Sequence, residues 1–138
     1  MAKILLVSDA PSVLDDLAAV VDDGEHLVEE LRDGAAVRAA VEVDPPDLVI
    51  TDCQVQNMGG FAICFDLKLE HSGGRQPHVP VLVLLDRRPD VFLARRSGAE
   101  GYLVKPLDPL RIRRAVEALL DGGTYHDESL RPVTVSAR

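Results

Sequence analysis

The sequence predicts an α/β domain built on a parallel sheet with helices on both faces. Short apolar runs of strand length alternate with amphipathic segments of helical length, in the order βαβαβαβαβα. Right-handed crossovers between parallel strands place helices on both faces of such a sheet. Some of the apolar runs end in a charged residue, and ligands of open α/β sheets bind beyond the carboxyl ends of the strands. The pattern therefore predicts both an architecture and the place of a site.

The predicted strands are short, apolar segments bounded by turn residues. The second of them is the more polar, which favours the edge of the sheet, and the third is apolar throughout and favours the centre. The strands are predicted at residues 4–7, 27–31, 48–51, 81–85 and 102–104.

The predicted helices lie between and after these strands. Pro11 stands near the first turn of the first helix, where a missing N–H costs little. Pro45-Pro46 stops the second helix, and Gly59-Gly60 precedes the third. The last helix carries an apolar side that includes Ile112 and Val116. The helices are predicted at residues 11–21, 35–43, 61–70, 90–97 and 109–120.

The chain has the length of a single domain. Its 138 residues can bury most of their apolar surface. Residues 1–120 carry the alternating pattern and are expected to form that domain. Residues 121–138 contain Gly122-Gly123 and little apolar periodicity, and are expected to form a partly ordered C-terminal tail.

Composition argues against several classes of protein. No apolar run approaches the ~20 residues of a membrane span. No basic-then-apolar leader precedes the first strand, so we expect a cytoplasmic protein without membrane contact. Cys53 and Cys64 suit no metal-ligand spacing and are expected to be reduced thiols in the core.

The charge is acidic and uneven along the chain. The net charge of −8 argues against direct nucleic-acid binding. There are 15 acidic and 5 basic residues up to Val83, against 8 acidic and 10 basic residues from Leu84 onward. Most arginines of the second part, taken individually, are expected to lie on solvated helix faces. Together they favour a docking patch for an acidic partner.

Three strand ends carry chemically useful side chains. The first strand leads to Asp9, the third to Asp52 and the last to Lys105. Parallel strands end at one edge of the sheet, so these side chains are expected to form a small pocket there. Two carboxylates and one ammonium suit a divalent metal and a phosphoryl group. Alternatively, Asp9 caps the helix that follows it and Lys105 is a surface residue.

These residues resemble the receiver domain of two-component response regulators over residues 3–120. The order and spacing of short motifs carry the resemblance. The motifs are residues 4–9, residues 47–52, Met58 with Gly60, residues 80–84, residues 98–102 and Lys105-Pro106. The resemblance implies a flavodoxin-like, doubly wound five-stranded parallel sheet with strand order 2-1-3-4-5 and helices on both faces.

The resemblance also implies roles for individual residues. Asp52 would accept a phosphoryl group from a histidine kinase or another phosphodonor. Asp9, Asp52 and the backbone carbonyl of Gln54 would bind Mg²⁺, which prefers hard oxygen ligands. Lys105 would pair with Asp52 when the site is empty and with a phosphoryl oxygen when it is occupied. The Lys105–Pro106 bond is expected to be cis, which an X–Pro bond allows at little cost.

Two departures from the receiver pattern bear on the chemistry. Ser8 stands where receivers carry a second acidic residue, so one negative charge is lost and Mg²⁺ binding is expected to be weak. Leu85 stands where receivers carry Thr or Ser, whose hydroxyl donates to a phosphoryl oxygen. An unpaired buried oxygen costs about 1–3 kcal/mol. Leu85 is therefore the more serious departure.

Three further positions bear on the loops and the switch. Gln56 replaces the usual Pro and is expected to change only the rigidity of the loop. Arg87 lies where receivers tune access of water, and it either assists the phosphoryl group or is a solvated loop residue. Tyr102 matches the aromatic position that couples phosphorylation to the output face, or it is an ordinary strand tyrosine. Leu85 is expected to occupy space that the Tyr102 ring would need to move into.

The sequence therefore predicts a stand-alone, atypical receiver, a signalling protein and not an enzyme. Output is expected through a protein partner or a homodimer formed by the face that spans Arg95 to Arg114. The alternatives are a phosphorylation-independent interaction module and the receiver fragment of a longer regulator.

Overall fold

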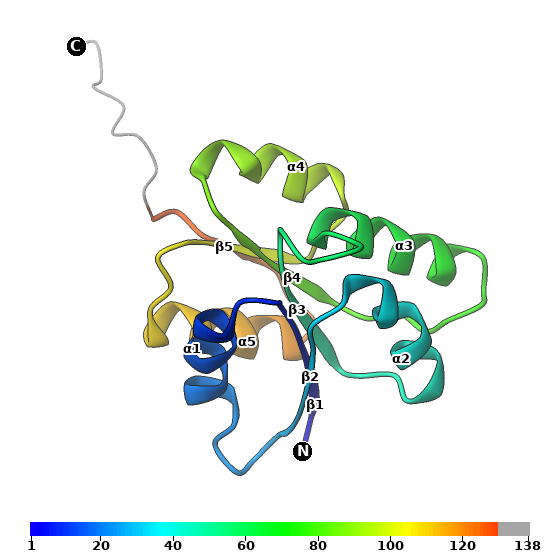
Figure 1. Ribbon diagram of the computed structural model, residues 1–138, viewed down its shortest axis with the longest axis horizontal. Coiled ribbons are helices and arrows are strands. Elements are labelled where there is room, and N and C mark those ends of the chain that lie inside the picture. Colours follow the sequence, from blue (N-terminus) through cyan, green and yellow to red (C-terminus); the bar gives the residue numbers. More distant parts are fainter. Residues whose placement is uncertain (130–138) are drawn as a thin grey trace.

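A single parallel sheet with strand order β2-β1-β3-β4-β5-β6 forms the centre of the molecule (Figure 1). The computed structural model describes residues 1–129. All neighbouring strands pair in parallel. The strands are β1 (Lys3–Val7), β2 (Leu27–Leu31), β3 (Leu48–Asp52), β4 (Val81–Leu85), β5 (Gly101–Val104) and β6 (Tyr125–His126).

Helices cover both faces of this sheet (Figure 1). Helices α1 and α5 pack on one face, where Leu14 and Ile112 join one apolar cluster. Helices α2, α3 and α4 pack on the other, where Val41, Ile63 and Ala94 join a second cluster. The helices are α1 (Pro11–Val21), α2 (Val37–Val43), α3 (Gly60–Ser72), α4 (Val91–Arg96) and α5 (Pro109–Leu120), with 3₁₀ turns η1 (Gly34–Ala36) and η2 (Arg88–Asp90).

The central strands are apolar because the sheet is covered on both sides. Every residue of β3 and of β4 is buried. β2 is instead largely exposed, with Glu29 and Glu30 among its five residues. This confirms the sequence prediction of a polar edge strand and an apolar centre. The two core clusters follow from alternation, since successive side chains of a strand point to opposite faces.

The order of the first five strands confirms the predicted 2-1-3-4-5 sheet. The predicted elements are all present, with ends shifted by a few residues. Two of the predicted helices begin as 3₁₀ turns, η1 and η2, before they continue as α2 and α4.

The structure adds a sixth strand that the sequence did not predict. β6 lies within the segment expected to be a tail and pairs with β5, so that Tyr125 stands beside Gly101 and His126 beside Tyr102. Two residues are too few for a hydrophobic period to be detectable in sequence. Residues 130–138 of the expected tail lie outside the described residues.

A close approach of the backbone fixes the loop after β3. A Cβ on Gly60 would lie 2.4 Å from the carbonyl oxygen of Asp52. The Gly60 N–H also donates to the carbonyl oxygen of Cys53 at 3.0 Å. Only glycine allows α3 to begin this close to the end of β3. The start of α3 thereby holds the loop that follows Asp52.

Candidate functional site

Asp52 and Lys105 form an ion pair at the carboxyl edge of the sheet. Asp52 ends β3 and is 3% exposed. Lys105 directly follows β5, and its Nζ donates to Asp52 Oδ1 at 2.8 Å. The Lys105–Pro106 peptide bond is cis, as the sequence predicted. The sequence-predicted pair of carboxylate and ammonium is therefore present as a direct contact.

Ser8 contributes a hydrogen bond to the same carboxylate. Its hydroxyl donates to Asp52 Oδ2 at 3.2 Å and accepts from the Ala10 N–H at 3.1 Å. Ser8 is fully buried. Sequence reasoning treated Ser8 only as a missing charge. In the folded protein, Ser8 and Lys105 together engage both oxygens of Asp52.

Asp86 is a site residue that sequence reasoning missed. It follows β4 directly, and its Oδ1 accepts from Lys105 Nζ at 2.8 Å. Its Oδ2 accepts from the Cys53 thiol at 3.3 Å. Lys105 therefore bridges two carboxylates, Asp52 and Asp86. The signal that identified Asp9 and Asp52, an acid at the end of a strand, applies equally to Asp86 and could have found it.

The charges at this edge stabilise one another. Burial alone lowers the pKa of Lys105, but hydrogen bonds to Asp52 and Asp86 outweigh it and raise that pKa above 10.5. The hydrogen bond from Lys105 is the main cause that lowers the pKa of Asp86 below 3.8. Burial raises the pKa of the Cys53 thiol to about 12. At neutral pH the site therefore holds the Lys105 ammonium, the Asp86 carboxylate and a neutral Cys53 thiol.

Asp9 and Gln54 stand at the rim of the site. Asp9 is exposed, and its Oδ2 accepts from the Gln56 N–H at 2.8 Å, which ties the start of α1 to the loop after β3. Gln54 is exposed and lines a depression of about 410 Å³ together with Cys53, Asp86 and Arg87. Asp9 thus lies at the predicted edge of the sheet, where its carboxylate is hydrogen-bonded to the backbone of the loop after β3.

The donor set suits a hard cation. One ligand atom each from Asp52, Cys53 and Asp86 lies within 4.8 Å of the others. The neutral thiol is a poor ligand, because the thiolate is the form that binds metals. Carboxylate oxygens remain, and these are the ligands that Mg²⁺ prefers. The residues present therefore fit an oxygen-bound divalent cation.

Leu85, Tyr102 and Arg87 are the positions expected to affect the response to phosphorylation. Leu85 is fully buried in the same core cluster as Tyr102, and it offers no donor. Tyr102 is 1% exposed, with its hydroxyl 3.4 Å from Arg95 Nη2 and its ring stacked on His126. Arg87 is well exposed and pairs with Asp90.

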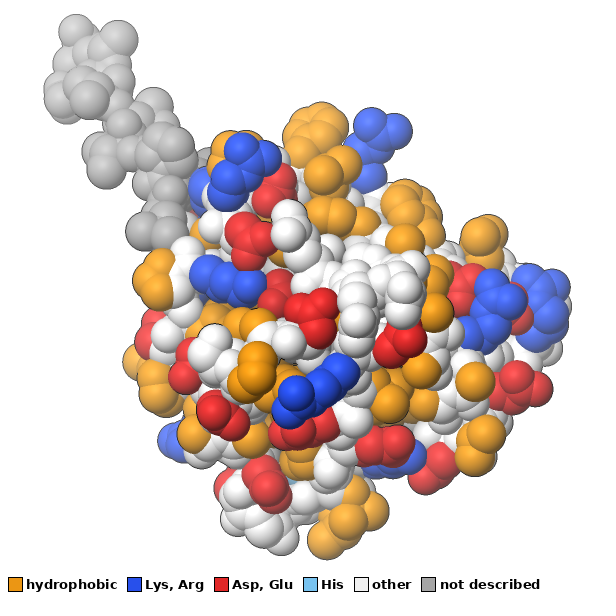
Figure 2. Space-filling view, in the orientation of Figure 1, with side chains coloured by type: hydrophobic (Ala, Val, Ile, Leu, Met, Phe, Trp, Pro, Cys, Tyr) orange, Lys and Arg blue, Asp and Glu red, His pale blue; other side chains and the backbone are white. Residues whose placement is uncertain are grey.

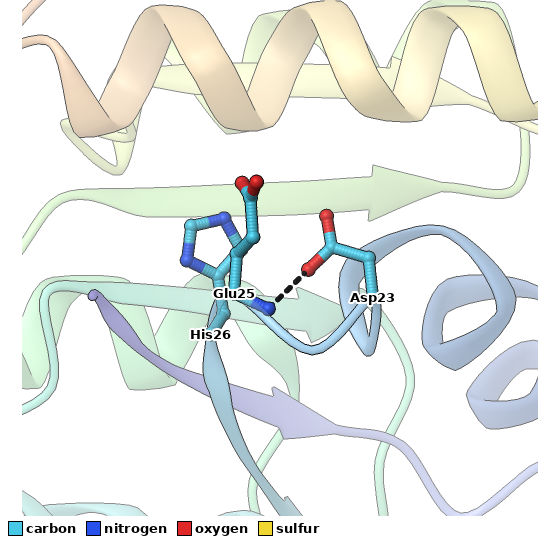
Figure 3. Close-up of side chains that lie close together, drawn as sticks. All are labelled: Asp23, Glu25 and His26. Carbon is cyan, nitrogen blue, oxygen red and sulfur yellow. Dashed lines mark hydrogen bonds between the residues drawn. The ribbon is translucent and has the colours of Figure 1, made fainter.

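A second group of ligand-type side chains lies at the opposite edge of the sheet. Asp23, Glu25 and His26 gather in the loop that enters β2 (Figure 3), with ligand atoms within 4.8 Å of one another. The Asp23 carboxylate accepts from the Glu25 N–H at 2.9 Å. This bond stabilises the turn and accounts for the position of Asp23. Asp23 and Glu25 are exposed, and the group lies away from Asp52.

No large patch of one charge covers the face seen in Figure 2, where acidic and basic side chains interleave. The uneven charge along the sequence is thus mixed by folding on this face.

Within residues 1–129, no helix is long and apolar enough to cross a membrane. Cys53 and Cys64 are both buried free thiols.

Comparison with known proteins identifies one family. Residues 4–117 match the response regulator receiver domain. The chain is 29% identical to the protein PilH of Pseudomonas aeruginosa over 122 residues, which are 88% of this chain and all of PilH. It is 32% identical to the DNA-binding response regulator MtrA of Mycolicibacterium smegmatis over 86% of this chain and 50% of MtrA.

Solved structures agree with the sequence matches. The signal receiver domain of a signal transduction histidine kinase from Syntrophus aciditrophicus superposes with a TM-score of 0.78 at 25% identity, covering 99% of this chain and 98% of that one. The chemotaxis response regulator CheY4 of Vibrio cholerae superposes with a TM-score of 0.75 at 25% identity, covering 86% of this chain and 98% of that one.

Asp86→Asn should make the free energy of unfolding less sensitive to acid. Because the folded-state pKa of Asp86 is lowered, its ionised form contributes stability that is fully present above the ordinary value of 3.8. That contribution is lost as the pH falls through the lowered pKa. Urea unfolding of parent and variant from neutral to acidic pH measures the effect. The difference between the two proteins should shrink as the pH falls.

Asp15→Asn is the control, since Asp15 is exposed on α1. It removes the same charge away from Lys105. A difference between parent and Asp86→Asn that is the same at every pH would contradict an ionic role for Asp86.

Proposed function

From the fact that this chain belongs to the response regulator receiver domains of two-component signalling, we propose that Asp52 accepts a phosphoryl group and that the fold passes this state to a protein partner. The observation that carries the proposal is the buried Asp52 carboxylate held by Lys105 at 2.8 Å. Receiver domains are in general signalling modules that interact with histidine kinases or other partners. The chain spans all of PilH but half of MtrA and about a quarter of the response regulator PleD of Caulobacter vibrioides.

The transfer is a substitution at phosphorus. An Asp52 oxygen attacks the phosphorus of a phosphohistidine or of a small acyl phosphate, and a P–O bond forms as the bond to the donor breaks. The donor leaves as histidine or as a carboxylate with the bonding electron pair. The product is an acyl phosphate on Asp52. Negative oxygens accumulate during this step, so positive charge nearby lowers its barrier.

Lys105 supplies one such charge from the protein. Its ammonium is shared between Asp52 and Asp86 before transfer, and it exchanges one of these contacts for a phosphoryl oxygen afterwards. Asp9, Asp52 and the Gln54 carbonyl are the proposed ligands of Mg²⁺, with Asp86 nearby as a further carboxylate. Bound Mg²⁺ would neutralise negative charge on the phosphoryl oxygens.

Two features of this chain oppose fast transfer. Ser8 donates to the Asp52 oxygen that Lys105 leaves free, so a bond has to be given up before that oxygen reacts. Leu85 presents no hydroxyl to the phosphoryl group, and a missing donor at a buried oxygen costs about 1–3 kcal/mol. A signalling module that works without phosphorylation is therefore the second candidate. The buried Leu85 in the Tyr102 cluster is the observation that favours it.

The proposed output face comprises α4, β5 and α5. Arg96 and Arg114 are exposed on its two helices, and Phe92 is 70% exposed on α4. Arg111 differs from the expectation of a free docking residue, because its guanidinium contacts Asp108, Asp127 and the backbone. The basic part of the proposed docking face is thus Arg95, Arg96 and Arg114.

Incubation with acetyl phosphate and Mg²⁺ should add one phosphoryl group to the parent and none to Asp52→Asn. Leu85→Thr should take up the group roughly tenfold faster, because it restores a donor worth about 1–3 kcal/mol. Intact-protein mass spectrometry over time gives both rates. The control is Val83→Thr, which introduces a hydroxyl on the same buried face farther from the strand end. Equal uptake by parent and Asp52→Asn would refute Asp52 as the acceptor.

Ser8→Asp should bind Mg²⁺ several-fold more tightly than the parent, because it adds a carboxylate beside Asp52. Calorimetric titration measures the affinity without requiring phosphorylation. Ser8→Ala separates the two roles of Ser8, since it removes the hydrogen bond to Asp52 and adds no charge. Equal affinities in the parent and in both variants would show that Ser8 does not limit cation binding.

Arg96→Glu with Arg114→Glu should weaken self-association through the output face, and less so at high salt, because exposed charges are screened. Sedimentation velocity at low and high ionic strength tests this. Arg113→Glu is a control that reverses one charge outside the proposed face, since Arg113 is exposed on α5 beside Glu117 in a depression away from α4. A parent that remains monomeric throughout would exclude a second copy as the partner.

A further inference from the structure

Residues 125–129, here called the strap, cover the outer edge of β5. The Tyr125 N–H donates to the carbonyl oxygen of Glu100 at 3.1 Å, and β6 continues the sheet beyond Tyr102. The rings of Tyr102 and His126 stack with centroids 5.4 Å apart at an interplanar angle of 15°. Without the strap, β5 would be the edge strand of the proposed output face. The strap therefore occupies the backbone groups through which another chain could pair with β5.

A buried carboxylate anchors the strap. Asp127 is 1% exposed, and its Oδ2 accepts from the Val104 N–H at 2.8 Å and from Arg111 Nη1. Arg88 donates to the carbonyl oxygens of Asp127 and, at 3.3 Å, Ser129. A charge this buried is tolerated because it is paired and hydrogen-bonded. Removing Arg111 would leave the buried Asp127 carboxylate without its counter-charge, so the anchor is specific.

The anchor also holds the two peptide groups that flank Lys105. Arg111 Nη1 donates to the carbonyl oxygen of Val104 at 3.1 Å, and Arg111 Nη2 donates to that of Pro106. The Val104 N–H is the one that Asp127 accepts. Thus Val104 and Pro106 are fixed by Arg111 and Asp127, while Lys105 between them is fixed by Asp52 and Asp86. The phosphoryl site and the strap share one short backbone segment.

We propose that the strap is a built-in occupant of the output face, that Arg111 and Asp127 are positioning residues for Lys105, and that phosphoryl uptake at Asp52 releases the strap. This rests on the proposed function of Asp52. When Lys105 leaves Asp52 for a phosphoryl oxygen, the backbone at Val104 and Pro106 shifts, and the bonds to Arg111 and Asp127 weaken. Release then opens the β5 edge and the Tyr102 ring to a partner.

The coupling works in both directions. Phosphorylation can favour the released strap only if release in turn favours the phosphorylated state by the same factor. A partner that pairs with β5 has to displace the strap, so the unphosphorylated protein binds it weakly. The strap gives this chain a route from Asp52 to the output face that needs no hydroxyl at position 85 and no movement of Tyr102 past Leu85.

Hydrogen exchange of the strap amides tests the proposal in the full chain. The samples are the parent and Asp52→Asn, each with and without acetyl phosphate and Mg²⁺. Asp127→Asn breaks the ion pair with Arg111, and Asp121→Asn is its control, with the same charge change at an exposed position outside the strap. Lys105→Met breaks the pair with Asp52 without a phosphodonor. Exchange in β1 monitors global unfolding in every variant.

The expected result is strap exchange about fivefold or more faster in the phosphorylated parent, the lower end of typical coupling between sites. Asp52→Asn should not respond to the donor. Asp127→Asn should exchange fast with and without donor, and Asp121→Asn should behave as the parent. Lys105→Met should exchange faster than the parent in the strap while β1 remains protected.

Two outcomes separate this inference from the proposed function. If mass spectrometry finds Asp52 phosphorylated and strap exchange is unchanged, the inference is wrong and the proposed function stands. If Asp52 takes up no phosphoryl group, the proposed function fails. The Lys105→Met variant then tests the coupling between Lys105 and the strap without phosphorylation. Unchanged strap exchange in Lys105→Met then overturns the link between Lys105 and the strap.

Discussion

The contacts of the site depend on the position of one ammonium group, that of Lys105. Lys105 Nζ lies 2.8 Å from a carboxylate oxygen of Asp52 and 2.8 Å from one of Asp86. With Asp52 almost fully buried, loss of Lys105 would leave a carboxylate without its counter-charge, which costs about 3–5 kcal/mol in buried pairs. Asp52 ends β3, and Asp86 and Lys105 directly follow the neighbouring strands β4 and β5. The order of those strands in the sheet is what allows a single cation to reach both acids.

Other features of the site follow from that arrangement. The Cys53 thiol is directed to Asp86, which is held in place by Lys105. The Ser8 hydroxyl is directed to the Asp52 oxygen that Lys105 does not engage. On the other side of Lys105, Arg111 donates hydrogen bonds to the carbonyl oxygens of Val104 and Pro106. A reaction at Asp52 that displaces Lys105 would therefore be expected to affect contacts on several elements, because Asp86, Val104 and Pro106 are held next to the lysine.

Periodicity was sufficient to predict the layers of the fold, because a sheet buried on both faces requires continuous apolar strands such as β3 and β4. Strand ends also led to Asp52 and Lys105. Contacts between side chains were not predictable in the same way. From the sequence, Ser8 could be interpreted only as the loss of a negative charge, because a sequence pattern does not show where its hydroxyl points. Arg111 looked like a surface residue because its partner Asp127 lies in a segment whose two-residue strand has no period to detect.

The outermost longer strands of the sheet, β2 and β5, are protected from aggregation by different means. β2 is exposed, but it carries Glu29 and Glu30, and like charges discourage pairing with a second sheet. β5 has the sequence Gly-Tyr-Leu-Val, is buried along its whole length and has no charged side chain. It depends on residues 125–129 for cover. Exposure of such an uncharged, β-prone strand promotes intermolecular sheet formation. Loss of residues 125–129 is therefore expected to favour intermolecular pairing through β5.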